Sequence, residues 1–283
     1  MIAIDDPELP GLSNLDAAAL RRITGTEEVS VMRFRYRAGK RAILHLSTEG
    51  GEGSAWFFQG DKAKRLARRN KRTARYDASS EALYETFPCD HRMPQIRAFL
   101  EDYDRVAHDL IGGAPSGDPE LLRYRPGLSC TFRCPVDDGR AAYVKLINDD
   151  SPARLIEMNR LMVAQLAGKA VSVAPVIGAA LDHDAIAYAA AAGQPLDSAL
   201  ARTGDVTFVT RAIDMLRGFW SLTLRPTRRL TADVLRSRGA ESVALARLTI
   251  PAAAPVVDRA MARLDARTPH LDLRPIHGDM KLE

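Results

Sequence analysis

The chain has 283 residues, of which 46% are hydrophobic and 27% charged, and its net charge is +4. These values are ordinary for a globular protein with a sizeable core. The start, MIAIDDPELPGL, is acidic and does not resemble a signal peptide, and no run approaches the ~20 apolar residues of a bilayer span. We therefore expect a cytoplasmic protein without a membrane partner.

Three strands are predicted in the N-terminal part of the chain. The segment VSVMRFRYRAGKRAILHL indicates two strands joined by a turn at Ala38-Gly39. A glycine-rich turn and a third strand, Ser54 to Phe58, follow.

A strongly basic stretch follows these strands. Lys62 to Arg75 carries eight basic residues and no acidic one, and its pattern is helical. Clustered basic side chains can bind nucleic acid or an anionic membrane by displacing counterions from phosphates. A solvated helix face also explains them and is favoured, because no aromatic residue is interleaved for stacking on bases.

Small and turn-forming residues predict a linker at Gly113 to Pro119. We accordingly expect three parts: an N-terminal α/β extension or cap in residues 1–118, a small lobe with a hinge in 119–196, and a partial helical lobe in 197–283. A strand is expected to end near Tyr124, and two more run through Cys134 and over 141–147.

Part of the N-terminal pattern recurs after the linker. FRYRAGKRAILHL and LRYRPGLSCTFRC share Arg-Tyr-Arg and a later glycine, 88 positions apart. This indicates either a duplicated hairpin module or a coincidence in an arginine-rich chain.

The period of the pattern then changes from strand to helix. Residues 151–168 have helical spacing after a Ser-Pro start signal, and two antiparallel strands are predicted at 171–181 and 185–192. The remainder from Asp197 is mostly helical. The order predicts an α+β fold with segregated strands and helices.

This order can support nucleotide chemistry. A turn at Gly127 and Ser129 can present N–H groups to phosphates, Lys145 on the third strand can neutralise them, and Glu157 on the next helix can hold that lysine in an ion pair. Each residue also has an ordinary structural explanation, as a turn or solvent-facing side chain.

From about Leu121 onward the chain resembles the aminoglycoside phosphotransferase family of kinase-like enzymes. The resemblance lies in PGLSCTFRC, DDGRAAYVKL, AIAYAAAAGQPL and IHGDMKLE. It implies a protein-kinase-like fold, with an antiparallel small lobe and an incomplete, mostly helical large lobe, that binds ATP and Mg²⁺.

The resemblance also implies individual roles. Asp279 would deprotonate the acceptor hydroxyl, His277 would brace the loop, and Lys281 would stabilise the transferred phosphoryl group or be a solvated lysine. Backbone groups at Ala189 and Ala191 would contact adenine, although the acidic residue common in that hinge is absent.

The family pattern continues beyond Glu283, where its metal-binding Asn would follow. We therefore expect a chain truncated within the catalytic loop and inefficient as a kinase. Aligning Trp56-Phe57-Phe58 with Tyr143-Val144-Lys145 leaves Phe58 in place of the lysine, which argues against a second ATP site and favours a packing cap.

Three functions follow from these patterns. The first is an ATP-dependent phosphotransferase acting on a hydroxyl of a sugar, aminoglycoside or amino alcohol. The second is a catalytically inactive kinase-fold protein that binds nucleotide or a partner. The third is a nucleic-acid-associated protein that acts through the basic stretch. The acceptor and the oligomeric state stay open.

Overall fold

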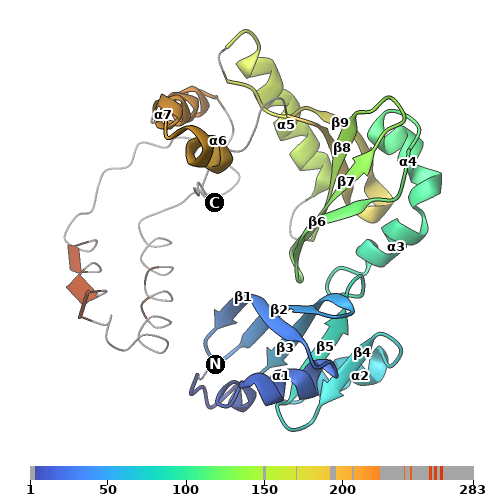
Figure 1. Cartoon of the computed structure of the whole chain (residues 1–283), viewed down its shortest axis with the longest axis vertical. Coiled ribbons are helices and arrows are strands. Elements are labelled where there is room, and N and C mark those ends of the chain that lie inside the picture. The colour runs from blue at the N-terminus through green and yellow to red at the C-terminus, as the bar shows by residue number, and fades with distance from the viewer. Residues whose placement is uncertain are drawn as a thin grey trace. The chain divides into compact units, whose positions relative to one another are not determined.

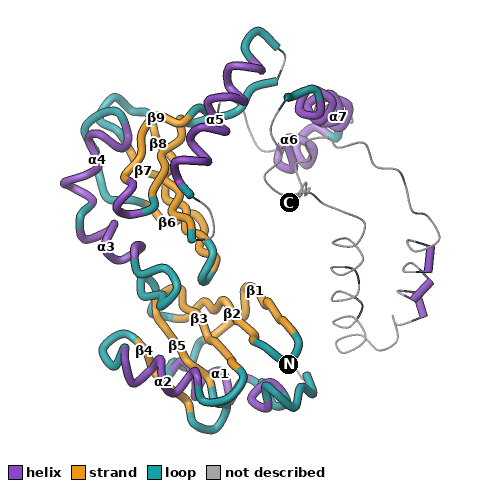
Figure 2. Tube along the Cα trace, turned by 180° about the vertical axis from the view of Figure 1, so that it is seen from behind, coloured by secondary structure: helices purple, strands orange, loops and turns teal. Residues whose placement is uncertain are grey.

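The computed structural model describes residues 4–148, 151–169, 171–191, 196–205 and 207–223, with a few separate positions after 238. It confirms the α+β class and contains two antiparallel sheets of five strands each (Figures 1 and 2). Two compact units contain these sheets. The first includes the chain up to Arg97 and the turn Arg125–Leu128, and the second includes Ala98–Tyr124 and Ser129–Arg229.

The first sheet has the strand order β1-β2-β3-β5-β4. Its strands are Val29–Arg37 (β1), Arg41–Thr48 (β2), Gly51–Phe58 (β3), Ala74–Asp77 (β4) and Ala82–Thr86 (β5). The three strands predicted from the sequence are β1, β2 and β3. Gly39 forms the predicted turn between the first two, with a φ of 63° that favours glycine.

Helices cover both faces of this sheet. The N-terminal segment and helix α1 (Ala17–Thr24) pack Leu12 and Ile23 against Phe57 on one face. Helix α2 (Lys62–Arg69) packs two small side chains, Ala63 and Ala67, against the other face. Coverage of both faces explains why consecutive positions of β2 and β3 are buried.

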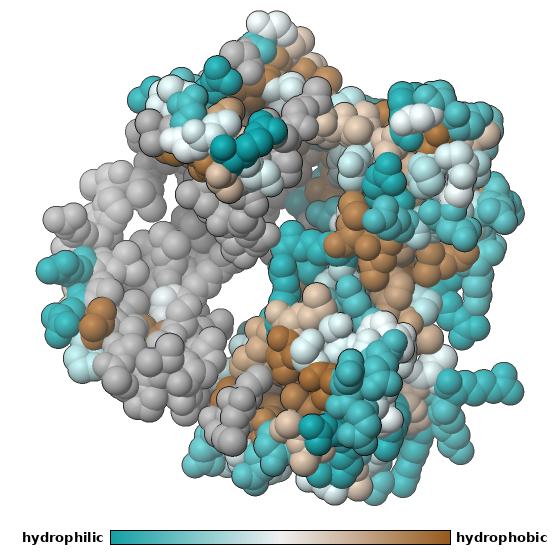
Figure 3. Space-filling model, in the orientation of Figure 1, coloured by the Kyte–Doolittle hydropathy of each residue, from teal (hydrophilic) through white to brown (hydrophobic). Residues whose placement is uncertain are grey.

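Helix α2 accounts for the first part of the basic stretch. Its alanines lie four residues apart on the buried side, and its basic side chains are exposed, so the surface over α2 is hydrophilic (Figure 3). The predicted solvated helix face is thus confirmed for 62–69. The stretch ends differently, because Ala74 and Arg75 begin strand β4.

The second sheet has the order β6-β7-β8-β10-β9. Its strands are Glu120–Arg125 (β6), Ser129–Pro135 (β7), Ala141–Ile147 (β8), Val176–Ala180 (β9) and Ala185–Ala189 (β10). The sequence predicted all five. Asp184, with a φ of 49°, closes the turn between the last two strands.

Helices accompany this sheet as well. Helices α3 (Gln95–Glu101) and α4 (Tyr103–Ile111) cover one face, where the rings of Phe99 and Phe132 lie 5.7 Å apart. The predicted helix at 151–168 is α5 (Pro152–Leu166). Helices α6 (Leu196–Thr203) and α7 (Thr207–Trp220) follow, as expected for the helical part.

Both units therefore repeat one architecture. Each has a helical segment before its first strand, three antiparallel strands, a helix and two further strands, and the sheet orders correspond strand for strand. The turn glycines Gly39 and Gly127 also share a positive φ, 63° and 66°. This common order supports duplication of a unit much larger than the hairpin that the sequence suggested.

The boundary between the units differs from the one expected at 118. Helix α4 packs on β9 and β10 of the second sheet. The predicted linker is bonded to the second unit, since the N–H of Ser116 donates to the carbonyl of Pro135 and that of Asp137 donates to Ala114. Its small and polar composition resembles a linker, but its backbone hydrogen bonds make it part of the domain.

No helix among the described residues is long and apolar enough to span a membrane.

Gly178 provides a test of where α4 belongs. A Cβ at this position would lie 2.2 Å from the carbonyl oxygen of Leu110, at the end of α4. We expect Gly178→Ala to lower the free energy of unfolding by about 1–3 kcal/mol, as overpacking does. Gly117→Ala is the control, because its nearest atom is 3.5 Å away. Equal urea midpoints for the two variants would contradict the packing of α4 on β9.

Candidate functional site

Lys145 lies on the central strand of the second sheet. It pairs with Thr131 on β7 and with Ile186 on β10, and directly paired residues share a face of the sheet. The neighbouring positions Val144 and Leu146 are buried on the opposite face, whereas Lys145 is exposed. Strand alternation therefore presents its ammonium group away from the core that α3 and α4 cover.

Helix α5 carries the expected partner, Glu157, which is exposed. Asn159 fixes this helix to the strand after it, because its amide donates to the carbonyl of Ala174 and accepts from the N–H of Val176, both at 2.9 Å. Among the ion pairs of the described residues, none joins Lys145 to Glu157. Their ion pair stays a prediction.

The turn between β6 and β7 does not present a free N–H to solvent. Pro126 and Gly127 are buried, and the N–H of Gly127 donates to Oδ2 of Asp90 at 2.6 Å. Ser129, half-buried, begins β7 and pairs with Ile147. Of the two residues expected to bind phosphate, Gly127 thus already binds a carboxylate.

Two further contacts hold this turn. Oδ1 of Asp90 accepts the N–H of Arg92 at 2.8 Å, and the guanidinium of Arg35 donates to the carbonyl of Pro126. Burial, followed by repulsion from Arg41 and Arg125, lowers the pKa of Arg35 to about 10. The arginine still carries its charge at neutral pH.

A buried polar cluster that sequence patterns did not single out lies beside this turn. Glu85 accepts from Nδ1 of His91 at 2.7 Å and from its backbone N–H at 3.1 Å. The His91 ring packs edge-on against Trp56, with centroids 4.6 Å apart. The only sign of this cluster in the sequence is the adjacent pair Asp90-His91, because Glu85 comes close to them only in the folded chain.

The expected alignment of the two third strands requires correction. Arg41 and Ser129 each stand two residues after their turn glycine, and they pair with Phe58 and Ile147. Trp56 lies two residues before Phe58 on β3, and Lys145 lies two residues before Ile147 on β8. The residue equivalent to Lys145 is therefore Trp56 and not Phe58. The hairpin connections differ in length, and sequence similarity therefore does not preserve cross-strand register. The conclusion that the first unit lacks a strand lysine is unchanged.

Of the hinge residues, Ala189 is the last residue of β10 and Ala191 follows that strand. The N–H of Ala189 donates to the carbonyl of Pro175 at 2.9 Å, and Ala191 is exposed. His277, Asp279 and Lys281 lie outside the described residues.

Comparison of the sequence with models of known protein families gives no match, and comparison with curated proteins gives none either.

Gly127 and Gly39 provide a matched pair for testing the turn. Alanine at either position adopts a left-handed backbone, which costs about 1–2 kcal/mol. A Cβ at Gly127 would also lie 2.6 Å from Cη2 of Trp56, whereas at Gly39 the nearest atom is 3.9 Å away. We expect Gly127→Ala to be more destabilising than Gly39→Ala by about 1–3 kcal/mol in urea unfolding. Equal losses would show that Gly127 does not pack against Trp56.

Proposed function

We propose that this protein is an ATP-dependent phosphotransferase with a kinase-like small lobe, acting on a hydroxyl of a small molecule such as a sugar, aminoglycoside or amino alcohol. The observation that carries the proposal is the second sheet. Its five antiparallel strands, with α5 after the third strand and an exposed Lys145 on that strand, support the small lobe that the sequence resemblance implies.

The described residues fit part of a nucleotide site. Lys145 offers an exposed cation at the centre of the sheet, where it can neutralise phosphate oxygens. Ala191 offers backbone groups on an exposed segment after β10. The N–H of Gly127 can donate to a phosphate only after its hydrogen bond to Asp90 is broken. When bound, Mg²⁺ would neutralise charge on the transferred group, and Asp279 would accept the proton of the acceptor hydroxyl.

One observation favours the second function, a kinase-fold protein that binds without turnover. The bond from Gly127 to Asp90 places a carboxylate where the proposed enzyme needs phosphate. Two anions cannot share one N–H donor, and their repulsion disfavours nucleotide binding at this turn. If this bond persists in solution, the small lobe is a platform for a partner or for weak nucleotide binding.

The enzyme hypothesis predicts transfer from ATP to a small hydroxyl compound. The protein should phosphorylate one or more sugars, aminoglycosides or amino alcohols, as followed by ADP release and mass spectrometry. Asp279→Asn should lower kcat by about 10²- to 10⁴-fold, the usual effect of removing a positioned base. Lys145→Ala should weaken transfer, whereas Lys169→Ala, at another exposed lysine, should not. Equal activity in all variants would contradict the hypothesis.

Asp90→Ala separates the two functions. If phosphate binds at Gly127, removal of the competing carboxylate should raise ATP affinity about two- to tenfold, the net value of one hydrogen bond. Asp138→Ala is the control, because it removes the same charge from an exposed turn. Calorimetric titration measures the ATP affinity of both variants. Unchanged or lower ATP affinity in a folded Asp90→Ala variant would contradict a phosphate site at Gly127.

A further inference from the structure

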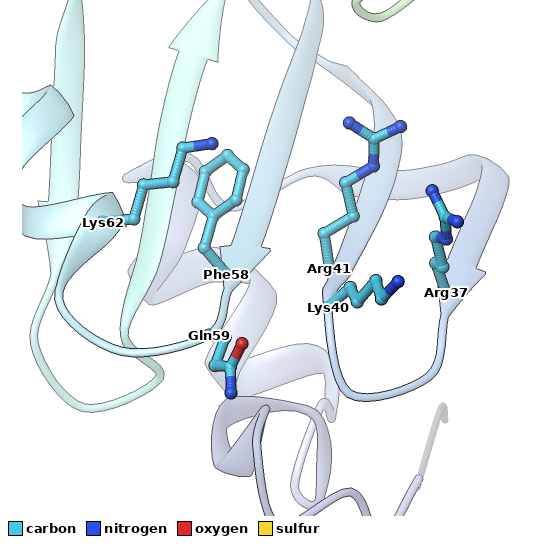
Figure 4. A pocket seen from close by; sticks show the side chains of 6 residues that line it. All are labelled: Arg37, Lys40, Arg41, Phe58, Gln59 and Lys62. Carbon is cyan, nitrogen blue, oxygen red and sulfur yellow. The ribbon is translucent and has the colours of Figure 1, made fainter.

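A strongly basic hollow lies at one end of the first sheet. Its volume is about 290 Å³. Three of its side chains come from the hairpin between β1 and β2, and three come from the end of β3 and the start of α2 (Figure 4). The lining residues are Arg37, Lys40, Arg41, Phe58, Gln59 and Lys62.

Backbone and ring contacts hold the two sides of this hollow in place. The N–H of Gln59 donates to the carbonyl of Lys40 at 3.3 Å, which ties β3 to the hairpin turn. The ammonium group of Lys62 lies 4.6 Å from the centroid of the Phe58 ring. Phe58 is 5% exposed and stacks on Trp56 with centroids 5.9 Å apart. The ring therefore forms a fixed floor, and cation–π attraction positions the lysine over it.

Positive charge dominates the lining. Four of its six side chains are cationic and none is acidic. The ion pairs of the described residues join none of Arg37, Lys40 and Lys62 to a carboxylate. Two carboxylates accept hydrogen bonds from the surrounding segments: Glu8 from the amide of Gln59 at 2.6 Å, and Asp6 from the backbone N–H of Gly39 at 2.9 Å. Like charges around one hollow repel each other, so a multiply charged anion there relieves the repulsion.

We propose that this hollow binds a small anion that carries two or more phosphoryl groups. The arginine forks match phosphate oxygens, and the lysines supply point charges beside them. A nucleic-acid strand fits less well, because the only aromatic ring in the lining is buried and cannot stack on a base. The proposal does not depend on the phosphotransferase function, since its residues belong to the other unit.

Calorimetric titration of the full chain with pyrophosphate, at about physiological ionic strength, tests the site. We expect binding that weakens about tenfold or more when Lys40→Gln and Lys62→Gln are combined, because two charge-assisted contacts are lost. The matched control combines Arg68→Gln and Arg69→Gln, which remove two charges from exposed positions on α2 outside the hollow. This control should change affinity less than twofold.

Two further titrations distinguish pyrophosphate binding in this hollow from binding at the proposed nucleotide site and from binding of nucleic acid. Lys145→Gln separates the two proposed sites: pyrophosphate binding that survives this change belongs to the hollow, whereas loss of all binding would show that pyrophosphate binds at the proposed nucleotide site and that the hollow is not a site. A single-stranded RNA of about 20 nucleotides should compete weakly with pyrophosphate. The proposal is overturned by absent pyrophosphate binding, by equal losses in both charge-removal pairs, or by tighter binding of the RNA.

Discussion

The central strand of each sheet determines which side chains this chain can bury and which it can present to a ligand. β3 and β8 each stand third in a five-stranded order and have hydrogen-bonded neighbours on both sides. In the first unit the residue at the key register position is Trp56, which is fully buried. In the second it is Lys145, which is exposed. Equivalent positions on the two central strands therefore hold a core residue in one unit and a candidate phosphate ligand in the other.

A second constraint comes from the turn at Gly127, which belongs to the first unit. The glycine is required twice, for its positive φ and for its approach to Trp56. Asp90 then saturates its N–H, and the guanidinium of Arg35 saturates the carbonyl before it. A buried turn with its polar groups paired is stable where it lies, so any ligand must replace these bonds and not merely add to them.

The sequence correctly predicted the strands and helices whose hydrophobic pattern agrees with the turn or helix-start residues beside them. A turn signal at Gly127 marked the start of β7, and a Ser-Pro start marked α5. It was insufficient for β4, which lies in a basic, largely polar stretch where local pattern favours helix. The linker at Gly113–Pro119 was misassigned because composition does not show where backbone hydrogen bonds go. The Asp90 contact was beyond prediction, because its partner lies 37 residues away and only the tertiary structure joins them.

The two glycine turns show how far the units have diverged within one architecture. Lys40 and Arg41 follow Gly39, whereas Leu128 and Ser129 follow Gly127. The first turn has an exposed lysine beside it and lines a cationic hollow, while the second is buried against a carboxylate. The positively charged glycine turn therefore belongs to the sheet without a strand lysine, whereas Lys145 belongs to the sheet whose β6–β7 turn is occupied by a carboxylate. Neither sheet combines a cationic glycine turn with a strand lysine, so the two anion sites that we propose lie on different sheets.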